Sequence, residues 1–548
     1  MSKVVILAIN AKYIHSSLSV WVLSEGVFRY ARTAHDVEVV EVTIHHNDSD
    51  IAGLVEAHNP DVIGISTYIW NARKLPDLLN LLRERLPKAA FVLGGPEAAH
   101  NAQYWLDNGA DFVLRGEGER SFPALIDMLA DKRSPEPIPG LCQKQNGEIH
   151  ITPEAGPIGD FIDPYSDAYF AGLGGRIAYI ETSRGCPFSC AFCLSGGTGV
   201  RFMPLEAAKE QIRRLADSGA RMIKFVDRTF NCNAQRAYEL FEYIIGLDTK
   251  GCFHFEVAAD LFDQPTLALL AAAPPGRIQF EAGLQSFYEP ALKASSRQTD
   301  LEKAEENIRA LLKAGNIHIH LDLIAGLPYE MLTDFMDSFD RAYRLGMHTL
   351  QLGFLKLLYG SVMREQWKSI VCAPQPPYEI ISSLWLSPDD LNVIKHAENA
   401  LQRTYNKGRF LSALRYALFA SGLRPFSFYH ALGQAAPNHG TQLEDYIGQL
   451  YTHCVKLPGV ETDALLDHMT IDWLGMVKGK NMPTFLRAVK ENDRLLRQVT
   501  AMAEDLLGRR IRRGEASVLR SGEGVFVDSE KRDPVSGLYQ VHILEHLA

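Results

Sequence analysis

Three cysteines fall close together in the segment Cys186-Pro-Phe-Ser-Cys190-Ala-Phe-Cys193. An apolar run typical of a β-strand, Ile177-Ala-Tyr-Ile180, comes just before them, so we expect the three thiols on one strand-end loop. Three thiolates can hold three irons of a [4Fe–4S] cluster and leave the fourth iron open, whereas electron-transfer clusters usually have four cysteine ligands. An open iron can bind and reduce a small molecule, which makes the cluster a reactive centre. The alternatives are a zinc site, which usually has a fourth ligand nearby, or three buried thiols.

The spacing of these cysteines resembles the hallmark motif of the radical S-adenosylmethionine superfamily. The resemblance implies that Cys186, Cys190 and Cys193 are the catalytic metal ligands and that S-adenosylmethionine is a second cofactor. Six strand candidates separated by helical runs follow residue 175: Arg176–Thr182, Arg221–Val226, Cys252–Ala258, Arg277–Gly283, His318–Ile324 and Thr349–Leu357. We therefore expect the partial (β/α)6 barrel of that superfamily, with its active site at the carboxyl ends of the strands.

Polar side chains cluster where these strands end. S-adenosylmethionine presents a carboxylate, an ammonium group and two ribose hydroxyls, so its site needs a cation and several hydrogen-bonding groups. The superfamily pattern implies that Arg297 binds the carboxylate and that Gln285 and Asp322 bind the ribose hydroxyls. A salt bridge between Arg297 and Asp322 at the barrel rim is the alternative. Further contacts to this cofactor are expected from Phe192, Gly196, Gly197, Glu256 and Ser286.

The first 130 residues alternate between short β-branched runs and amphipathic segments. The strand candidates are Lys3–Asn10, Val37–Ile44, Asp61–Thr67, Ala90–Pro96 and Asp111–Glu117. Such alternation predicts a doubly wound parallel sheet of the flavodoxin or Rossmann type, whose ligands bind at the carboxyl ends of the strands. The loops at these ends contain Ser66, Trp70, Asn71, Gly94, Gly95, Gly116 and Gly118, and the glycines allow a close approach of the backbone to a ligand.

This ordered set of loops resembles the cobalamin-binding domain that precedes the radical core in one large subclass, and it implies cobalamin as a third cofactor. Many such domains carry Asp-x-His-x-x-Gly after the first strand, with the histidine as a cobalt ligand. Here the stretch is Tyr13-Ile-His15-Ser-Ser-Leu18, without the aspartate and the glycine. A histidine ligand normally needs a partner that fixes its tautomer. We therefore expect no histidine on cobalt, and side chains from Ser66–Asn71 on its lower face.

Composition narrows the remaining possibilities. The chain has 548 residues, a net charge of −10 and a pI near 6.0, which argues against a broad nucleic-acid-binding face. We expect no secretory leader, and the sequence contains no apolar run of membrane-spanning length. Scattered cysteines fit a reducing compartment, so we expect a cytoplasmic protein.

The expected domains are a cobalamin-binding domain at 1–135, a proline-rich linker with a small hairpin near Gly147 at 136–175, the radical barrel at 176–370, and a region at 375–548. The last region is mainly helical, with helices over Pro388–Thr404, Arg409–Ala420 and Thr484–Leu507 and a terminal hairpin across Gly524–Val527 and Leu538–Ile543. It resembles an uncharacterised extension of some cobalamin-dependent radical enzymes, and we expect it to cap the barrel mouth.

Taken with the resemblance, these features predict a cobalamin-dependent radical S-adenosylmethionine enzyme. The leading reaction is methylation of an unactivated carbon through a 5′-deoxyadenosyl radical and methylcobalamin. The alternatives are a radical cyclisation, rearrangement or redox reaction with the same cofactors, and a cobalamin-binding regulatory protein with a structural cluster. The expected partners are a substrate of open identity (a small molecule, a peptide or a modified nucleotide) and a reductant such as flavodoxin or ferredoxin.

Overall fold

The computed structural model describes residues 2–131, 137–154, 159–436, 442–478, 481–487, 493–512 and 514–544. The chain divides into two compact units. The first comprises Met1–Glu256 with the short segments Ser295–Gln298 and Leu355–Ile381, and the second comprises Val257–Ala294, Thr299–Phe354 and Ser382–Ala548. This division falls inside the predicted barrel, and the domain borders expected from the sequence stay a prediction.

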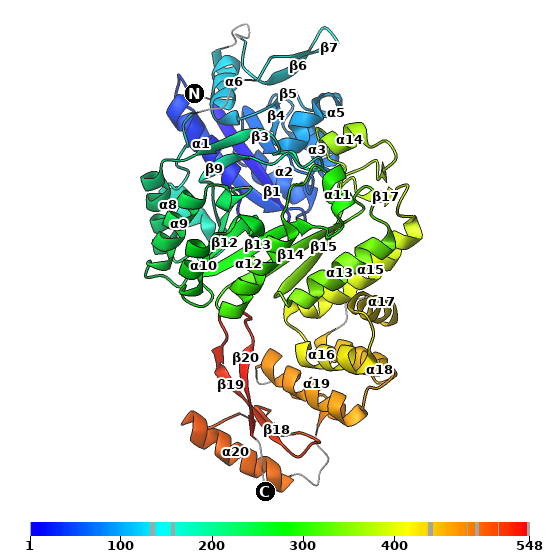
Figure 1. Cartoon of the computed structure of the whole chain (residues 1–548). Coiled ribbons are helices and arrows are strands. Elements are labelled where there is room, and N and C mark those ends of the chain that lie inside the picture. The colour runs from blue at the N-terminus through cyan, green and yellow to red at the C-terminus, as the bar shows by residue number, and fades with distance from the viewer. Residues whose placement is uncertain are drawn as a thin grey trace. The chain divides into compact units, whose positions relative to one another are not determined.

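The first unit begins with the predicted α/β domain (Figure 1). Its five parallel strands are β1 (Lys3–Asn10), β2 (Asp36–Thr43), β3 (Val62–Ser66), β4 (Ala90–Gly94) and β5 (Phe112–Leu114), in the order β2-β1-β3-β4-β5. The helices are α1 (Leu18–Tyr30), α2 (Asp48–Glu56), α3 (Leu75–Arg85), α4 (Pro96–His100), α5 (Ala102–Asp107) and α6 (Gly118–Asp131). The predicted fold class of this domain is confirmed.

Alternate residues of β1 pack into two different cores, because successive side chains of a strand point to opposite faces. Val5 lies in a core with residues of α2 and α3, and Val4 lies in a core with residues of α1 and α6. A strand that is buried on both faces reads as an unbroken apolar run, as Val4–Ile9 does. Because the five strands are parallel, their carboxyl ends lie at one edge of the sheet, where ligands of such folds bind.

The segment predicted as a linker contributes strands to this sheet, which the sequence analysis missed. β6 (Leu141–Gln145) pairs antiparallel with β5, and β7 (Glu148–Ile151) pairs antiparallel with β6. The expected hairpin near Gly147 is present, and Gly147 has the positive φ of 86° that its turn requires. The rest of the expected linker contains α7 (Asp167–Leu173). Residues 155–158 lie outside the described part of the chain.

All six predicted barrel strands are present in one sheet, in the order β15-β14-β13-β12-β11-β8. They are β8 (Ala178–Ile180), β11 (Met222–Phe225), β12 (Cys252–Val257), β13 (Ile278–Gln285), β14 (His318–Ala325) and β15 (Thr349–Phe354). The helices between them are α8 (Leu205–Asp217), α9 (Ala234–Ile245), α10 (Gln264–Ala271), α11 (Glu289–Ala294), α12 (Leu301–Ala314) and α13 (Leu332–Leu345). The pairings within each unit are parallel.

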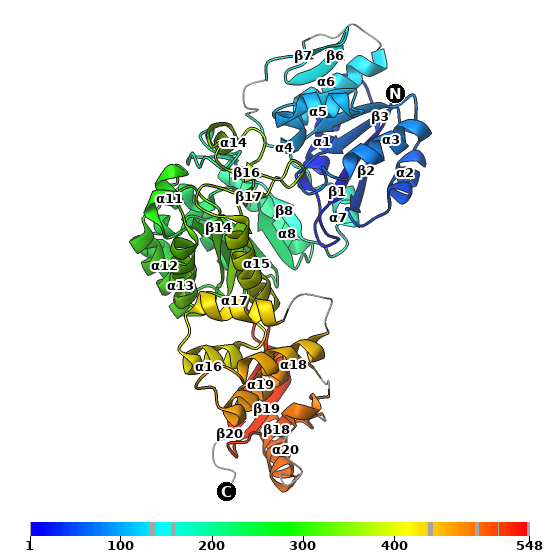
Figure 2. The same cartoon turned by 90° about the vertical axis from the view of Figure 1, so that its right-hand side faces the viewer.

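The second unit continues into the helical region expected at the C-terminus (Figure 2). Its helices are α15 (Pro388–Arg403), α16 (Leu411–Ser421), α17 (Pro425–Ala435), α18 (Leu443–Cys454) and α19 (Thr462–Met476). Ser387 starts α15 with a reciprocal cap, because its hydroxyl accepts from the Asp390 amide and the Asp390 carboxylate accepts from the Ser387 amide.

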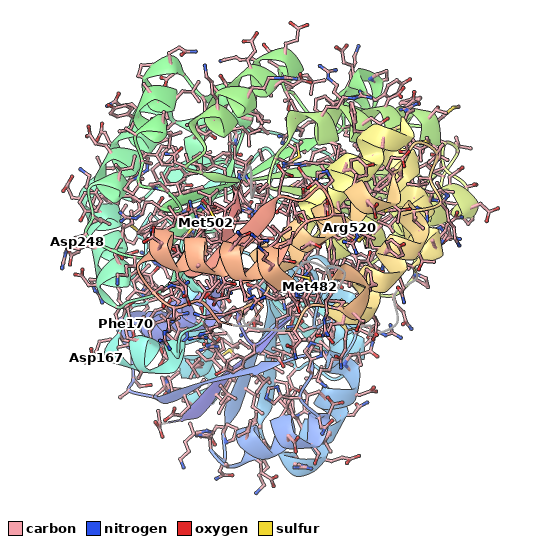
Figure 3. All side chains as sticks on the ribbon, turned by 90° about the horizontal axis from the view of Figure 1, so that it is seen from below. Asp167, Phe170, Asp248, Met482, Met502 and Arg520 are labelled. Atoms are coloured by element: carbon pink, nitrogen blue, oxygen red, sulfur yellow. The ribbon has the colours of Figure 1, made fainter. Side chains whose placement is uncertain are left out.

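One expectation for the end of the chain needs correction, and a second is confirmed and extended. The helix predicted over Thr484–Leu507 consists of a short 3-10 turn at Thr484–Leu486 and of α20 (Asp493–Leu507), while residues 488–492 lie outside the described part. The predicted hairpin is part of a three-stranded antiparallel sheet, β18 (Ala516–Val518), β19 (Gly524–Arg532) and β20 (Tyr539–Leu544). α20 packs on β18 and β19 through Val499 and Ala503, and Met502 on the same helix is exposed (Figure 3).

Within the described residues, no helix combines the length and the apolar character that crossing a lipid bilayer would need.

Candidate functional site

The cysteine loop is anchored by a small hairpin directly after β8. β9 (Ser183–Cys186) pairs antiparallel with β10 (Gly199–Phe202), with Cys186 opposite Gly199. Gly185 has a φ of 93°, and a Cβ atom there would lie 1.9 Å from the carbonyl oxygen of Gly199. Only glycine fits this position, so Gly185 is a requirement of the hairpin that leads to Cys186.

Each of the three thiols contacts a different kind of group: a hydroxyl, a guanidinium and a backbone amide. The Cys186 sulfur lies 3.6 Å from the Thr229 hydroxyl, the Cys190 sulfur accepts from the Arg297 guanidinium at 3.6 Å, and the Cys193 sulfur accepts from the Ser195 amide at 3.4 Å. Cys186 and Cys190 are buried, and Cys193 is half-buried. Two of these partners, the Arg297 guanidinium and the Ser195 amide, donate to sulfur, as a thiolate ligand needs.

The donor set suits an iron–sulfur cluster better than a single ion. Among the described residues, no three His, Cys, Asp or Glu side chains converge on one metal-ion position. In a cluster each thiolate binds a different iron, so the three sulfurs need not meet at one point. The zinc alternative requires such convergence. The residues present therefore fit a cluster with three cysteine ligands.

Two segments distant in sequence hold the middle of the cysteine loop. The Ala191 amide donates to the Ser295 carbonyl at 2.9 Å, and the Ala191 carbonyl accepts from the Met363 amide at 2.8 Å. Met363 belongs to α14 (Val362–Gln366), which lies with β16 (Val371–Cys372) and β17 (Ile380–Ser382) in the segment Leu355–Ile381 of the first unit. The sequence analysis did not predict these two contacts to the cysteine loop.

Some of the residues predicted to bind S-adenosylmethionine lie in the first unit, on or beside the cysteine loop. Arg297 reaches Cys190, as described, and its guanidinium lies 5.6 Å from the centre of the Phe188 ring. Phe192 and Gly196 on the loop are half-buried, and Gly197 is exposed. A Cβ atom on Gly196 would lie 3.2 Å from the Phe188 carbonyl oxygen, so the loop is tightly folded there. Glu256, near the end of β12, is half-buried on the face opposite the fully buried Phe255.

The second unit carries the predicted ribose-binding pair on neighbouring strands. Half-buried residues alternate with fully buried ones along β13 and β14, and both Gln285 and Asp322 belong to the half-buried face. In the register of the two strands Asp322 lies opposite Gly283, and a bulge follows before Gln285. The Gln285 Oε1 atom is buried without a hydrogen-bond partner among the described residues, which leaves an acceptor available to a ligand hydroxyl.

The Ser286 side chain, unlike that of Gln285, has its hydroxyl bonded inside the protein. It is fully buried, and its hydroxyl donates to the Glu330 carboxyl at 2.5 Å. Its side chain is thus committed inside the fold. A cofactor contact by Ser286 remains a prediction, and the geometry favours a supporting role.

The glycines of the N-terminal domain shape the edge of the sheet at which the strands end. Gly95 has a φ of 98°, and a Cβ atom there would lie 2.7 Å from the Thr67 carbonyl oxygen. The Thr67 amide donates to the Gly94 carbonyl at 2.7 Å, so the ends of β3 and β4 are drawn together. In the next loop Gly116 has a φ of 75°, and Gly118 starts α6.

Trp70 and Asn71 follow β3 and differ sharply in exposure. The Trp70 indole is 44% exposed, is stacked on Tyr68 at 4.3 Å, and donates to the Ile9 carbonyl at 3.1 Å. Asn71 is fully buried, and its side chain binds three backbone groups, at Ile9, Ser66 and Tyr68. Ser66 is buried at the end of β3. Of the predicted lower-face residues, Trp70 alone presents an exposed and fixed side chain.

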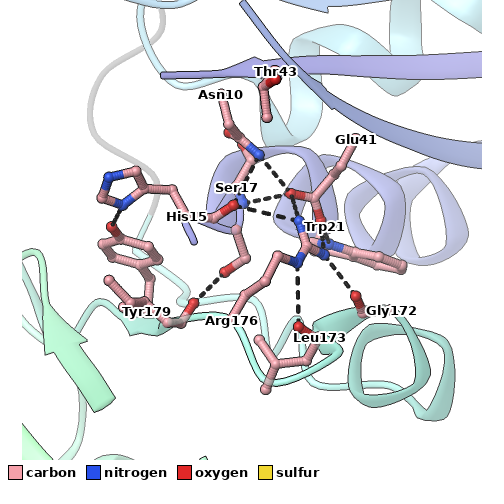
Figure 4. Close-up of polar contacts among 12 residues, drawn as sticks. Asn10, His15, Ser17, Trp21, Glu41, Thr43, Gly172, Leu173, Arg176 and Tyr179 are labelled. Atoms are coloured by element: carbon pink, nitrogen blue, oxygen red, sulfur yellow. Dashed lines mark hydrogen bonds and ion pairs between the residues drawn. The ribbon is translucent and has the colours of Figure 1, made fainter. Parts of the chain in front are cut away.

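His15 has a partner that sequence reasoning did not find. Its Nδ1 atom lies 2.6 Å from the Tyr179 hydroxyl on β8, and its backbone forms an isolated parallel bridge with Ile177 (Figure 4). Burial, together with Lys12 and Lys224, lowers the pKa of His15. His15 thus joins the loop after β1 to the first strand of the barrel sheet.

The same joint contains a buried ion pair between Arg176 and Glu41. Two nitrogens of Arg176 lie 2.9 and 3.1 Å from the Glu41 carboxylate, which also accepts from Asn10, Ser17 and Trp21 (Figure 4). With so many donors the buried carboxylate is fully compensated, as a buried charge must be.

A second ionic contact ties the cysteine hairpin to the glycine loop after β5. Arg184, two residues before Cys186, pairs with Glu117 at 3.2 Å, Glu119 at 2.6 Å and Glu181 at 2.7 Å. Arg201, on β10, also pairs with Glu117. Burial disfavours the charge, but Glu181 and Glu119 outweigh it and raise the pKa of Arg184. We call these residues the Arg184 ion cluster. Nothing in the sequence pattern singled out Arg184.

Comparison with known families agrees with this architecture. Residues 4–126 match the B12 binding domain, residues 180–342 match the radical SAM superfamily, and residues 365–514 match a family of proteins of unknown function, DUF4080. The chain therefore contains a B12 binding domain followed by a radical SAM domain.

Two curated relatives and one solved structure show the extent of the similarity. The hopanoid C-3 methylase of Methylococcus capsulatus is 30% identical over 248 residues, which span 42% of this chain and 46% of the relative. The cobalamin-dependent radical SAM methyltransferase TokK of Streptomyces tokunonensis is 26% identical over 327 residues, 54% of this chain and 46% of the relative. The chain thus spans about half the length of these relatives.

The solved structure is that of the cobalamin-dependent S-adenosylmethionine radical enzyme OxsB with aqua-cobalamin and S-adenosylmethionine bound. It matches with a TM-score of 0.60 and 15% identity over 93% of this chain and 82% of that one. At this identity the match establishes the fold.

Replacing Cys186, Cys190 and Cys193 together with alanine should abolish the uptake of iron and sulfide during anaerobic reconstitution, because no cysteine ligand would remain on the loop. Cys232 is the matched control, since it is another half-buried thiol whose electrostatic surroundings include Cys186. Cys232→Ala should keep about four irons per chain. Iron and sulfide analysis decides, and retention of the cluster in the triple variant would sink the assignment.

Proposed function

We propose that this chain is a cobalamin-dependent radical S-adenosylmethionine enzyme that methylates an unactivated carbon. One observation carries the proposal: the first unit holds both the cysteine hairpin and the ligand edge of the B12 binding domain, and the Arg184 ion cluster joins them directly. A regulatory protein with a merely structural cluster would have no need for an open fourth iron position or for the Gln285 acceptor.

The roles of individual side chains follow from their chemistry. Arg297 would bind the carboxylate of S-adenosylmethionine, and Gln285 and Asp322 would bind its ribose hydroxyls, since a guanidinium suits a carboxylate and paired acceptors suit a diol. Glu256 would take the ammonium or ribose, and Phe192 and the Gly196–Gly197 backbone would contact the adenine and methionine parts. When bound, the cluster supplies a one-electron reductant and the cobalamin a methyl carrier.

The edge formed by Gly94, Gly95, Gly116 and Gly118 would receive the corrin and its nucleotide tail, with Trp70 beneath the cobalt. An exposed indole held by stacking and by a hydrogen bond is a preorganised apolar surface for a macrocycle. It offers no nitrogen lone pair to a metal. Electrons would come from a flavodoxin or ferredoxin in a reducing cytoplasm.

The test of this function is anaerobic incubation of the reconstituted protein with S-adenosylmethionine that carries an isotopically labelled methyl group, together with a cell extract. Mass spectrometry should find an acceptor that gains the labelled methyl in wild type and not in Arg297→Ala. Turnover of S-adenosylmethionine to products without any labelled acceptor would exclude methyl transfer and favour a cyclisation, rearrangement or redox reaction.

The cobalt environment yields a separate prediction. Because the segment around His15 lacks the aspartate and the glycine of the cobalt-ligand motif, and because the His15 backbone is held in the strand bridge with Ile177, we expect cobalamin in its cob(II) state to show no nitrogen superhyperfine splitting from the protein in its electron paramagnetic resonance spectrum. His15→Ala should leave the spectrum unchanged. A splitting that is present in wild type and lost in His15→Ala would show that the histidine does bind cobalt.

A further inference from the structure

A buried carboxyl group lies beside the predicted ribose-binding strands and has no role in the chemistry described above. Glu330 is fully buried in the loop that follows β14. Its Oε1 atom accepts from the Ser286 hydroxyl at 2.5 Å and from the Ser338 hydroxyl at 3.2 Å, and its Oε2 atom has no hydrogen-bond partner among the described residues. We call these three residues the Glu330 cluster.

The two serines of the Glu330 cluster also hold the backbone after β13. The Ser286 hydroxyl accepts from the Tyr288 amide at 2.8 Å, and the Ser338 hydroxyl accepts from the Phe287 amide at 3.1 Å. Ser338 comes from α13, so three segments of the second unit meet at one carboxyl group. Each hydroxyl donates to the carboxyl and accepts from an amide, which fixes the loop at residues 286–288.

Backbone strain occurs on both sides of this contact. Gln285 has a φ of 73° and Tyr329 a φ of 68°, and both are non-glycine residues in the left-handed region. Gln285 directly precedes Ser286, and Tyr329 directly precedes Glu330. Such conformations persist only where the surroundings impose them, and they gather at functional sites. The Ser286–Glu330 hydrogen bond therefore clamps two strained turns to each other.

The clamped turns are those that aim the predicted ligand groups. Gln285 ends β13 with its Oε1 atom buried and without a recorded partner, and Asp322 lies on β14 within the adjoining register. If the turn at Gln285 relaxed to ordinary backbone angles, its amide would point elsewhere, because a change of φ swings the whole side chain. Keeping the turn strained keeps the acceptor in place.

We propose that Glu330 is a positioning residue for S-adenosylmethionine: through Ser286 and Ser338 it locks the strained Gln285 turn in the ligand-binding conformation. This inference rests on the proposed function, because it assumes that Gln285 contacts that cofactor. Glu330 itself does not touch the ligand. Its effect is to reduce the ordering that binding would otherwise require.

The protonation state of Glu330 gives the inference a measurable signature. Burial raises the pKa of Glu330 to about 8, and the Asp334 carboxylate at the start of α13 acts in the same direction. At pH 7 the group is therefore a neutral carboxyl with no cation recorded beside it in the described chain. As the pH rises above about 8 an unpaired charge would appear in the interior, so the lock should weaken.

The sign of the stability effect follows from linkage. Since the folded pKa lies above the ordinary value of 4.5, the folded chain keeps a proton that the unfolded chain has lost between pH 4.5 and about 8. Stability then falls as the pH rises through that window. Glu330→Gln, which is neutral at every pH, should be relatively more stable than wild type at pH 9 than at pH 5.

The experiment is calorimetric titration of the full-length, cluster-reconstituted protein with S-adenosylmethionine, without reductant, at pH 7 and at pH 9. Glu330→Ala should bind about tenfold more weakly than wild type at pH 7, as expected when buried hydroxyls lose their acceptor. Glu330→Gln should bind within about twofold of wild type at pH 7, because its carbonyl oxygen still accepts from both serines.

Between pH 7 and pH 9, wild type should lose more affinity than Glu330→Gln. The control is Glu306→Gln on α12, an exposed position with the same change of charge, which should follow wild type at both values. Arg297→Ala serves as the reference for loss of a direct contact, and it should stay weak at both pH values.

The outcomes separate the two proposals. If wild type carries its full iron content but binds no S-adenosylmethionine, the proposed function fails and this inference fails with it. If wild type binds and Glu330→Ala binds equally well, or if Glu330→Gln shows the same pH dependence as wild type, the positioning role alone is wrong. Should Glu330→Ala not fold, the comparison of wild type with Glu330→Gln across pH still decides.

Discussion

The contact between Arg184 and its three carboxylates is the interaction on which the rest of the site depends. Arg184 lies on the strand that leads into the first cluster cysteine, while Glu117 lies on the glycine loop of the B12 binding domain and Glu119 in the first turn of α6. Buried ions hold a geometry only when each charge is compensated, and one guanidinium that bridges several carboxylates does this with directional hydrogen bonds. The hairpin with the thiols and the edge expected to bind cobalamin are therefore parts of one structure.

The ion pair between Arg176 and Glu41 is a second buried and compensated charge. It lies just before β8 in the chain, whereas Arg184 comes just after β8. The Arg176–Glu41 pair and the His15–Tyr179 contact fix the loop after β1 to the start of β8. β8 in turn leads to the cysteine hairpin. Polar contacts before, on and after β8 in the chain thus set the position of the cluster loop, and the apolar cores supply the stability around them.

The sequence predicted most of the elements but few of their connections. Strand periodicity and turn residues located five strands of the first sheet and all six strands of the second, because β1 reads as an unbroken apolar run and because β13 and β14 alternate between buried and half-buried residues. Proline suggested a linker where β6 and β7 extend the first sheet, since an edge hairpin has only a weak periodic signal.

For the site, residue chemistry identified the cysteines and the cofactor-binding candidates. It could not find Arg184, Tyr179 or Glu330, because their roles arise from contacts between residues far apart in sequence. It also grouped Asn71 with Trp70, although one is a fully bonded loop anchor and the other an exposed ring. Ser286 was expected at the ligand for the same reason: its sequence position beside Gln285 does not reveal that its side chain points inward.

The most direct test of this account is the thermodynamic coupling between the two cofactor sites. The dissociation constant of cobalamin should be measured by equilibrium dialysis on the same protein with and without the reconstituted cluster. If the Arg184 ion cluster joins the sites, the cluster should tighten cobalamin binding by at least about fivefold in wild type, and the difference should vanish in Arg184→Gln. A cobalamin affinity that is the same with and without the cluster in wild type would contradict the account.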